Sequence, residues 1–293
     1  MSAIDMNRDS FVSGNLPPIL STEIIQKIQQ DSAVMQLARK TELSGTGDTI
    51  PVVLGDPEAY WAAETEKKTT SKAAVTTKLM TPYTLSVIVP FSNQFRRDAQ
   101  KLYDELLRRL PGALGIKFDK TVFGGADKPG DNFDNFAGVT AYSMDSDVYG
   151  ALVSADTDVS LHDGIVDGWV ISPQMRGVLL GTKDTTNRPL FINNVGEGAV
   201  PTLLGARSIV RKNAFVQGSP NIIGVCGDWS QALWGMVEGI DVSYSDQATI
   251  TIDGKQVNLW ERNMFAVRAE CEVGFRADTS VFAAISKTSV PSA

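Results

Sequence analysis

The residue types that most often carry chemistry are sparse in this 293-residue chain. Its one histidine, His162, lies in the polar stretch SLHDG, and nothing in the sequence marks the partners that a catalytic triad or a zinc site would need. Cys226 and Cys271 form no CxxC pair and have no metal-binding spacing. We therefore expect two reduced thiols in a core, and we interpret His162 as a surface loop residue.

Other candidate chemistry is equally weak. Glu64 and Glu66 are close enough to consider as a general acid and base, but the neighbouring Lys67 and Lys68 are typical of a solvated charged tip. The chain has no GxxxxGK[ST] phosphate loop, and the glycine-containing stretch 224–235 lacks the GxGxxG spacing of a dinucleotide site. The sequence therefore predicts a protein that is not an enzyme and that holds no cofactor and no metal ion.

Composition limits the class of protein further. The net charge is -7 and the sequence pI is about 4.9, which argues against a free-standing nucleic-acid binder but allows a protein that encloses nucleic acid without gripping it. No apolar run approaches the ~18 residues of a membrane span, and the polar N-terminus lacks the apolar segment of a secretory signal. We expect a soluble, intracellular product.

One long helix is the element around which the sequence is organised. A β-branched run, VIVP, ends near Ser92, a good N-cap for a helix that begins at Asn93. Apolar residues then recur at every fourth position, and Pro111 predicts a bend. The apolar series is Leu102, Leu106, Leu110, Leu114, Phe118 and Val122, and the polar side that remains carries Lys101, Asp104, Glu105, Arg108 and Asp119.

Before this helix, the sequence predicts a long β-hairpin. Two strand-like runs, TIPVV and VTTKLM, enclose the segment Glu64–Lys72, which has two glutamates and three lysines and almost no apolar side chain. Such a tip cannot bury itself, so we expect it to project as an arm or a lid. Nearer the N-terminus, a polar, proline-containing arm precedes a helix that Ser21 can cap, with a break near Asp31–Ser32.

Residues after the long helix are typical of mixed α/β structure. The glycine-rich stretch 124–139 is a plausible boundary, and a short helix is expected over 145–152. WVIS predicts a strand, and Pro173 can occupy the first position of the helix that follows. We expect strands at 188–192, 202–210 and 221–230, a short helix at 230–237, a hairpin with a DG turn, and two final strand-like runs.

Taken together, these segments resemble the major capsid proteins of tailed bacteriophages. The resemblance covers nearly the whole chain in the right order, which makes it far more specific than any single motif. The matching segments are STEIIQKIQQDSAVMQLA, TIPVV, AYWAAETEKKTTS, VTTKLMTPYTLSVIVPFSNQFRRDA, the long helix ending FDKTVFGG, WVISPQMRGVLLGTKDTTNRPLF, TLLGARSIV and NMFAVRAECEVGFRADTSVFAAI.

The resemblance implies an α+β Hong Kong 97-type capsid fold. It implies an N-terminal arm at 1–48, an extended loop at 49–84, a peripheral domain with the spine helix at 85–130 and 261–293, and an axial domain at 131–260. The implied function is self-assembly, as hexamers and pentamers, into an icosahedral shell. That shell would enclose double-stranded DNA without sequence-specific binding or a membrane. Portal, scaffolding and decoration proteins are further partners, and the implied location is the virion, assembled in the host cytoplasm.

Two alternatives remain at this point. An encapsulin, a bacterial compartment of the same fold, would hold cargo enzymes instead of DNA, and an unrelated soluble enzyme would use the hairpin as a lid. If the chain forms shells, the projecting tip and the start of the spine helix are where we expect contact with neighbouring subunits. The candidate contact residues are Trp61, Glu64, Glu66, Lys67, Lys68, Lys72, Arg96, Arg97 and Asp98.

Overall fold

A computed structural model describes the chain from residue 32 to residue 289 with internal gaps. The described ranges are 32–53, 60–62, 64–65, 67–68, 75–98, 100–183, 186–188, 190–191, 202–252 and 254–289. The expected arm before residue 21 and the helix that Ser21 would cap lie outside these ranges. Glu66 and Lys72 lie outside them too, and so does the side chain of Asp98.

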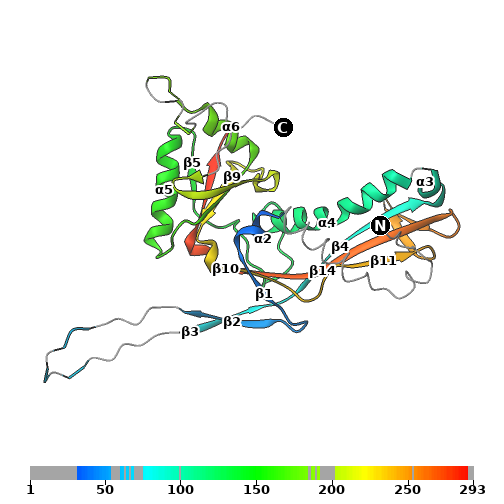
Figure 1. The fold of residues 1–293 in the computed structure, drawn as a ribbon, viewed down its shortest axis with the longest axis horizontal. Helices are drawn as coiled ribbons and strands as arrows, with labels where there is room; N and C mark the ends of the chain where they lie inside the picture. Colours follow the sequence, from blue (N-terminus) through cyan, green and yellow to red (C-terminus); the bar gives the residue numbers. More distant parts are fainter. Residues whose placement is uncertain are drawn as a thin grey trace, which may run out of the picture.

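Two β-sheets organise the described residues (Figure 1). In the five-stranded sheet, the long β14 pairs on its two sides with β10, β11 and β4, and β1 pairs with β10. The six-stranded sheet has the order β5-β15-β9-β6-β8-β7. The strands of the first sheet are β1 (Arg39–Glu42), β4 (Tyr83–Ser92), β10 (Ala232–Met236), β11 (Asp241–Ser245) and β14 (Met264–Ala277); those of the second are β5 (Ala141–Ser143), β6 (Gly168–Ile171), β7 (Thr202–Leu203), β8 (Ala206–Val210), β9 (Asn221–Gly227) and β15 (Phe282–Lys287).

The spine helix follows β4 as the sequence predicts. Helices α3 (Asn93–Asp98) and α4 (Gln100–Val122) come directly after Ser92, whose Oγ accepts a hydrogen bond from the Gln94 backbone N–H at 3.2 Å. The predicted four-residue apolar spacing is confirmed in the second half of α4, where Leu110, Leu114, Phe118 and Val122 are at most 8% exposed. Pro111 lies inside the helix. The second half of the helix is therefore stabilised by burial of one continuous stripe.

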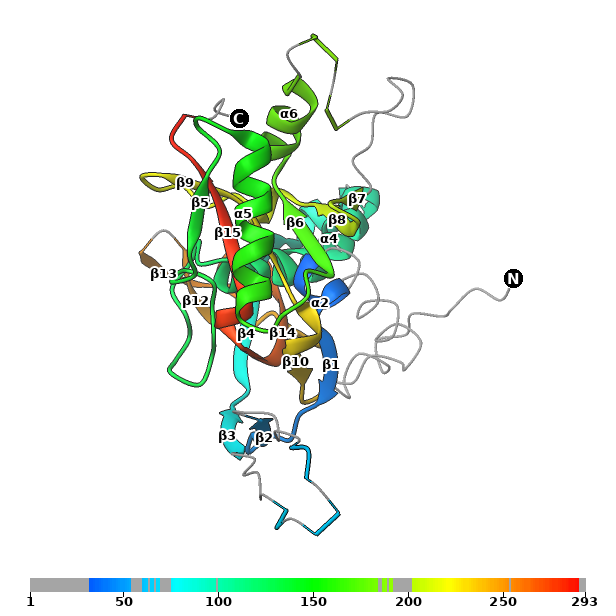
Figure 2. The same cartoon turned by 90° about the vertical axis from the view of Figure 1, so that its left-hand side faces the viewer.

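The six-stranded sheet lies between helices. On one face lies α5 (Val148–Leu161), capped by Asp147; on the other lie α2 (Ala33–Leu37) and the end of α4 (Figures 1 and 2). Helix α6 (Pro173–Gly181) starts where β6 ends, because the Ser172 Oγ accepts a hydrogen bond from the Met175 N–H at 3.1 Å and Pro173 needs no donor at the first helical position. The position of Pro173 was predicted, whereas the cap by Ser172, which was expected to end the strand, was not.

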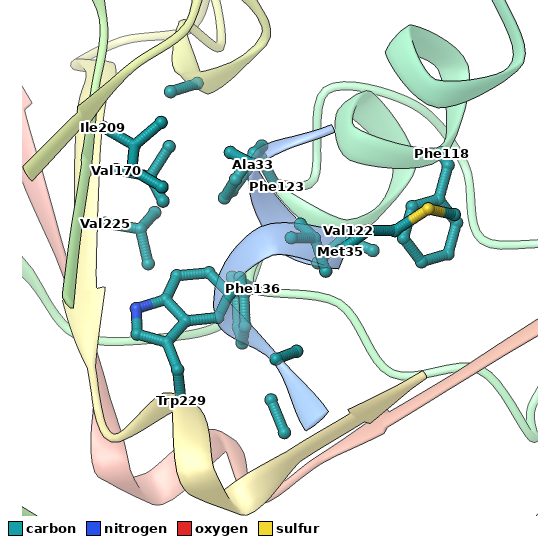
Figure 3. Close-up of a cluster of buried hydrophobic side chains, with 14 of the residues drawn as sticks. Ala33, Met35, Phe118, Val122, Phe123, Phe136, Val170, Ile209, Val225 and Trp229 are labelled. Carbon is teal, nitrogen blue, oxygen red and sulfur yellow. The ribbon is translucent and has the colours of Figure 1, made fainter. Parts of the chain in front are cut away.

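A buried cluster joins the two sheets. Figure 3 shows side chains from α2, the end of α4 and the six-stranded sheet meeting in one core, with Phe136 and Trp229 at its centre. The Phe136 ring stacks on Phe282 with centroids 4.5 Å apart, and it meets Trp229 edge-on at 5.8 Å. Aromatic rings bury large areas, so this cluster makes the relative position of the sheets costly to change.

Several expectations differ from the structure. The helix expected over 145–152 is longer and begins at Val148. The short helix expected at 230–237 is instead a 3-10 turn, η3 (Trp229–Gln231), followed by β10. Strand β10 pairs with β1 on one side and β14 on the other, and this pairing overrides the local preference for a helix. The strand expected at 188–192 is absent from its described residues, Arg188, Leu190 and Phe191.

Each of the two sheets contains strands from both the expected axial and the expected peripheral range. Strands β10 and β11 lie within the expected axial range 131–260, yet they pair with β14 in the sheet that contains β4. The final strand, β15, lies within the expected peripheral range 261–293, yet it inserts between β5 and β9. Pairing partners are set by the inward faces of the strands, which the order of the chain does not specify.

Candidate intersubunit surfaces

A two-stranded hairpin extends away from both sheets (Figure 1). Strand β2 (Asp48–Val53) pairs antiparallel with β3 (Val75–Met80), from Asp48 opposite Met80 to Val53 opposite Val75. The predicted hairpin is therefore confirmed. An isolated two-stranded ribbon is marginally stable in water, so an element of this shape gains most from a surface to lie on.

The described residues beyond the paired strands are exposed. Trp61 has a relative exposure of 103% and Tyr60 of 54%, and Glu64, Lys67 and Lys68 are also exposed. A fully exposed tryptophan on a projecting element is the kind of side chain that interfaces bury at their centres. The structure thus brings these predicted contact residues onto one arm, and their contact with a neighbour stays a prediction.

The root of the hairpin is locked by a side chain in a glycine slot. Met80 is fully buried against Gly235 of β10 and Gly274 of β14, which lie opposite each other in the sheet register. A Cβ at Gly274 would lie 2.8 Å from the Met80 Cγ, and one at Gly235 would lie 3.0 Å from its Cε. The two glycines therefore make room for the methionine, which joins the hairpin to the five-stranded sheet.

A guanidinium group completes the root. Arg276 of β14 donates from Nε to the Leu79 carbonyl oxygen at 2.8 Å. Its Nη1 donates to Asp134 Oδ1, and its Nη2 to Asn132 Oδ1, each at 2.9 Å. The Arg276 side chain is only 11% exposed, so this fork holds the arm in a fixed direction with little competition from water. Sequence reasoning missed Arg276, although a glycine inside a strand pattern such as Gly274 signals close approach.

Comparison with known proteins agrees with this architecture. The sequence profile of the Phage capsid family matches residues 14–285. The chain belongs to the phage capsid family. It is 28% identical over 297 residues to the probable major capsid protein gp17 of Mycobacterium phage D29, with 94% of this chain and 91% of that protein covered.

Solved structures share the fold of this capsid protein. A chain from Gordonia phage Cozz superposes with a TM-score of 0.74 at 20% identity, covering 88% of this chain and 87% of that chain. A chain titled as the capsid of an empty GTA particle, computed with C5 symmetry, gives a TM-score of 0.63 at 14% identity, covering 88% and 90%. The expected α+β, Hong Kong 97-type capsid fold is confirmed.

At the start of the spine helix, the capsid protein uses one of the predicted contact residues internally. Arg96 is exposed, but its guanidinium lies over the Phe265 ring, 4.9 Å from the centroid. Burial raises the pKa of Tyr244, and the positive charge of Arg96 opposes that rise. Arg96 therefore helps to hold α3 against β14 and β11, and Arg97, also exposed, lies next to it. That this cluster serves neighbouring subunits more than its own chain stays a prediction.

Asp119 corrects the expected polar side of the spine helix. The residue is fully buried, because α2 and the turn η2 (Lys212–Ala214) cover that side of α4. Its carboxylate accepts hydrogen bonds from Ser32 Oγ at 2.5 Å and from the Ala33 and Val34 N–H groups at 2.9 and 3.4 Å. Asn213 Nδ2 donates at 3.5 Å. Burial, opposed by these donors, raises the pKa of Asp119 to about 6.

The remaining candidates for chemistry lie where the sequence predicts. His162 is in the exposed turn after α5, with Nδ1 2.9 Å from the Asp158 carbonyl oxygen. Cys226 and Cys271 are free and buried, and burial raises the pKa of both thiols, which makes them poor nucleophiles. Among the described residues, no group of three or more His, Cys, Asp or Glu side chains could hold a metal, and no helix is long and apolar enough to cross a membrane.

Proposed function

We propose that this capsid protein is the major shell subunit, which self-assembles as hexamers and pentamers into an icosahedral head around double-stranded DNA. The observation that carries the proposal is the hairpin, which is rigid at its root and exposed along its described outer residues. Arg276 and Met80 hold it before any neighbour is present. Because the direction of the arm is already fixed at its root, the arm loses little conformational entropy when it binds another subunit.

Weak contacts are sufficient for such a shell. Each arm contact need contribute only modestly, because a subunit held by several neighbours gains from effective concentration. We assign the peripheral role to the side with the spine helix and the five-stranded sheet. The axial role goes to the side with the six-stranded sheet. The tip residues and the Arg96–Asp98 cluster are the proposed intersubunit contacts.

The charge of the protein supports a container rather than a binder. A net charge of -7 does not favour tight contact with a densely packed polyanion, so DNA is enclosed without sequence-specific recognition. We place the protein in the virion after assembly in the host cytoplasm. Portal, scaffolding and decoration proteins are the further partners expected at such a shell.

Electron microscopy of the purified protein tests the proposal. We expect wild-type protein to form closed shells, and deletion of Glu64–Lys72 to give a folded subunit that closes none. The far-UV circular dichroism of the deletion variant is the control for folding. Normal shells from the deletion variant would remove the hairpin from the proposal. Native particles that retain a foreign enzyme in place of nuclease-protected DNA would favour the encapsulin alternative.

A further inference from the structure

Two segments of the six-stranded sheet and of the elements packed on it have opposite charge. Residues 141–167, which include β5 and α5, contain six aspartates and no lysine or arginine. Residues 202–216, which include β7, β8 and η2, contain three cations and no acidic residue. The aspartates are Asp145, Asp147, Asp156, Asp158, Asp163 and Asp167, and the cations are Arg207, Arg211 and Lys212.

The fold places these segments on different sides of the sheet. In the order β5-β15-β9-β6-β8-β7, β5 is one edge and β7 is the other. Helix α5 packs over β5 and β15, and Figure 2 shows it in front of the sheet with β8 and β7 to its right. We call residues 141–167 the acidic flank and residues 202–216 the basic edge. One copy of the chain cannot bring its own flank and edge together.

Neighbouring charges leave the sign of the acidic flank unchanged. Lys287 of β15 reaches Asp145 at 3.7 Å, and it neutralises one of the six aspartates at most. Asp228, next to Asp167, adds a further negative charge on this side. His162 faces Asp158 at 3.8 Å. On the basic edge, Arg207 is exposed near the start of β8, and Lys212 is exposed at the start of η2, which follows β8.

Apolar side chains accompany the charges on both surfaces. Tyr149, Val153 and Leu161 share one face of α5 at four- and eight-residue spacings, with exposures of 53%, 38% and 75%, and Ile165 beyond the helix is 77% exposed. On the basic edge, Leu204 in the β7–β8 turn is 42% exposed. Exposed apolar residues surrounded by charge are typical of a surface that another protein covers.

We propose that the acidic flank of one copy packs against the basic edge of the next copy, head to tail. The partner is a second copy of this chain, because the two surfaces have opposite charge and each carries apolar side chains. A contact between two different surfaces is heterologous, and it closes into a ring when the rotation between copies allows. This inference rests on the proposed shell function, and it assigns the contact within each ring.

Paired double variants test the contact. Thr157→Lys with Leu161→Lys adds cations to the exposed face of α5, and Arg207→Glu with Lys212→Glu reverses the basic edge. The matched control, Lys255→Glu with Arg262→Glu, makes the same reversal at exposed positions in β13 (Lys255–Asn258) and the turn after it, beside the other sheet. Native mass spectrometry measures rings, and circular dichroism measures folding.

We expect each flank or edge variant to remain a folded monomer, with ring formation reduced by at least about tenfold. The control should form rings as the wild type does. Mixing the two defective variants leaves one intact flank and one intact edge, so one contact can form between a copy of each variant. The other contact would pair two surfaces that are both net negative, because two added lysines do not offset six aspartates. The mixture should therefore form heterodimers through the one intact contact, but no rings. Wild-type rings should weaken at high salt, since opposite charges are screened.

Three results would overturn the inference. These are a wild-type yield of rings from either defective variant, homodimers from one variant alone, and failure of the mixture to form heterodimers. If a charge reversal prevents folding, Arg207→Gln with Lys212→Gln replaces it, with a smaller loss of rings expected. Absence of rings and shells from the wild type would instead defeat the proposed shell function. The two failures are therefore distinguishable.

Discussion

The substitution Asp119→Asn tests how a buried carboxylate joins the spine helix to the segment that precedes β1. Asp119 lies in α4, and its four hydrogen-bond donors come from Ser32, Ala33, Val34 and Asn213. Asparagine keeps the size of the side chain and removes its charge. One carboxylate oxygen is replaced by an NH₂ group, which cannot accept the hydrogen bonds that this oxygen accepted.

The sign of the pH effect follows from the raised pKa of Asp119. In the folded chain this pKa is about 6, against an ordinary pKa of 3.8 for an aspartate in the unfolded chain. The folded state therefore binds more protons than the unfolded state between these values, and stability falls as pH rises through that window. Between pH 7 and 4.5, acidification should raise the free energy of unfolding by about 2 kcal/mol through this group. Asp119→Asn cannot show this gain.

The assay is thermal unfolding of unassembled subunits of both proteins at matched pH and low concentration. Other carboxylates titrate in the same range, but they cancel when the variant is subtracted from the wild type. About 2 kcal/mol corresponds to a shift of roughly 3 °C in Tm for a chain of this size. We expect the wild-type Tm minus the variant Tm to grow by that amount on acidification from pH 7 to 4.5.

The control is Asp163→Asn, which removes a carboxylate from the exposed turn after α5 instead of from the core. A wild-type minus Asp119→Asn difference that stays flat would mean that the carboxylate does not titrate in this window. A difference that shrinks on acidification would mean that the hydrogen bonds outweigh burial and hold the pKa of Asp119 low. Either result refutes the reasoning.

The remaining predictions concern the hairpin. Gly274→Ala places a Cβ 2.8 Å from Met80 Cγ and should lower the free energy of unfolding by about 1–3 kcal/mol in denaturant titration, whereas Gly138→Ala, where no atom lies within 4 Å, should be nearly silent. Equal effects of the two substitutions on the free energy of unfolding would contradict the close packing of Met80 against Gly274. Trp61→Ala should leave the subunit Tm unchanged but lower the yield of shells seen by electron microscopy, with Trp260→Ala, at another exposed tryptophan, as the control. Normal shells from Trp61→Ala would exclude it as an anchor.

Patterns that depend on near neighbours could be predicted from the sequence. The four-residue spacing gave the buried stripe of α4, and Ser92 and Pro173 marked helix starts that the structure confirms. Alternation and a DG turn predicted the hairpin of β12 (Thr249–Ile252) and β13. The arm was predicted in the same way, from two β-branched runs around a charged tip. Capping and periodicity act over a few residues, so a single sequence contains them.

Features that depend on distant contacts could not be predicted in this way. From its own residues the stretch 230–237 is predicted to be a helix, but residues 232–236 form strand β10 because β1 and β14 pair with it on either side. The slot for Met80 needs two glycines in neighbouring strands that are far apart in the chain. The fork of Arg276 is completed by partners more than 140 residues away.

The sequence by itself therefore determined the elements of this capsid protein, its projecting arm and, through the order of those elements, its family. The tertiary structure alone decided which side of each element is covered. Asp119 has the polarity of a surface residue, and it is buried because α2 and η2 pack over α4 from positions 85 or more residues away. The strands of the two sheets were likewise sorted by packing of their inward faces. Burial and register are properties of pairs of elements, so no pattern within one element contains them.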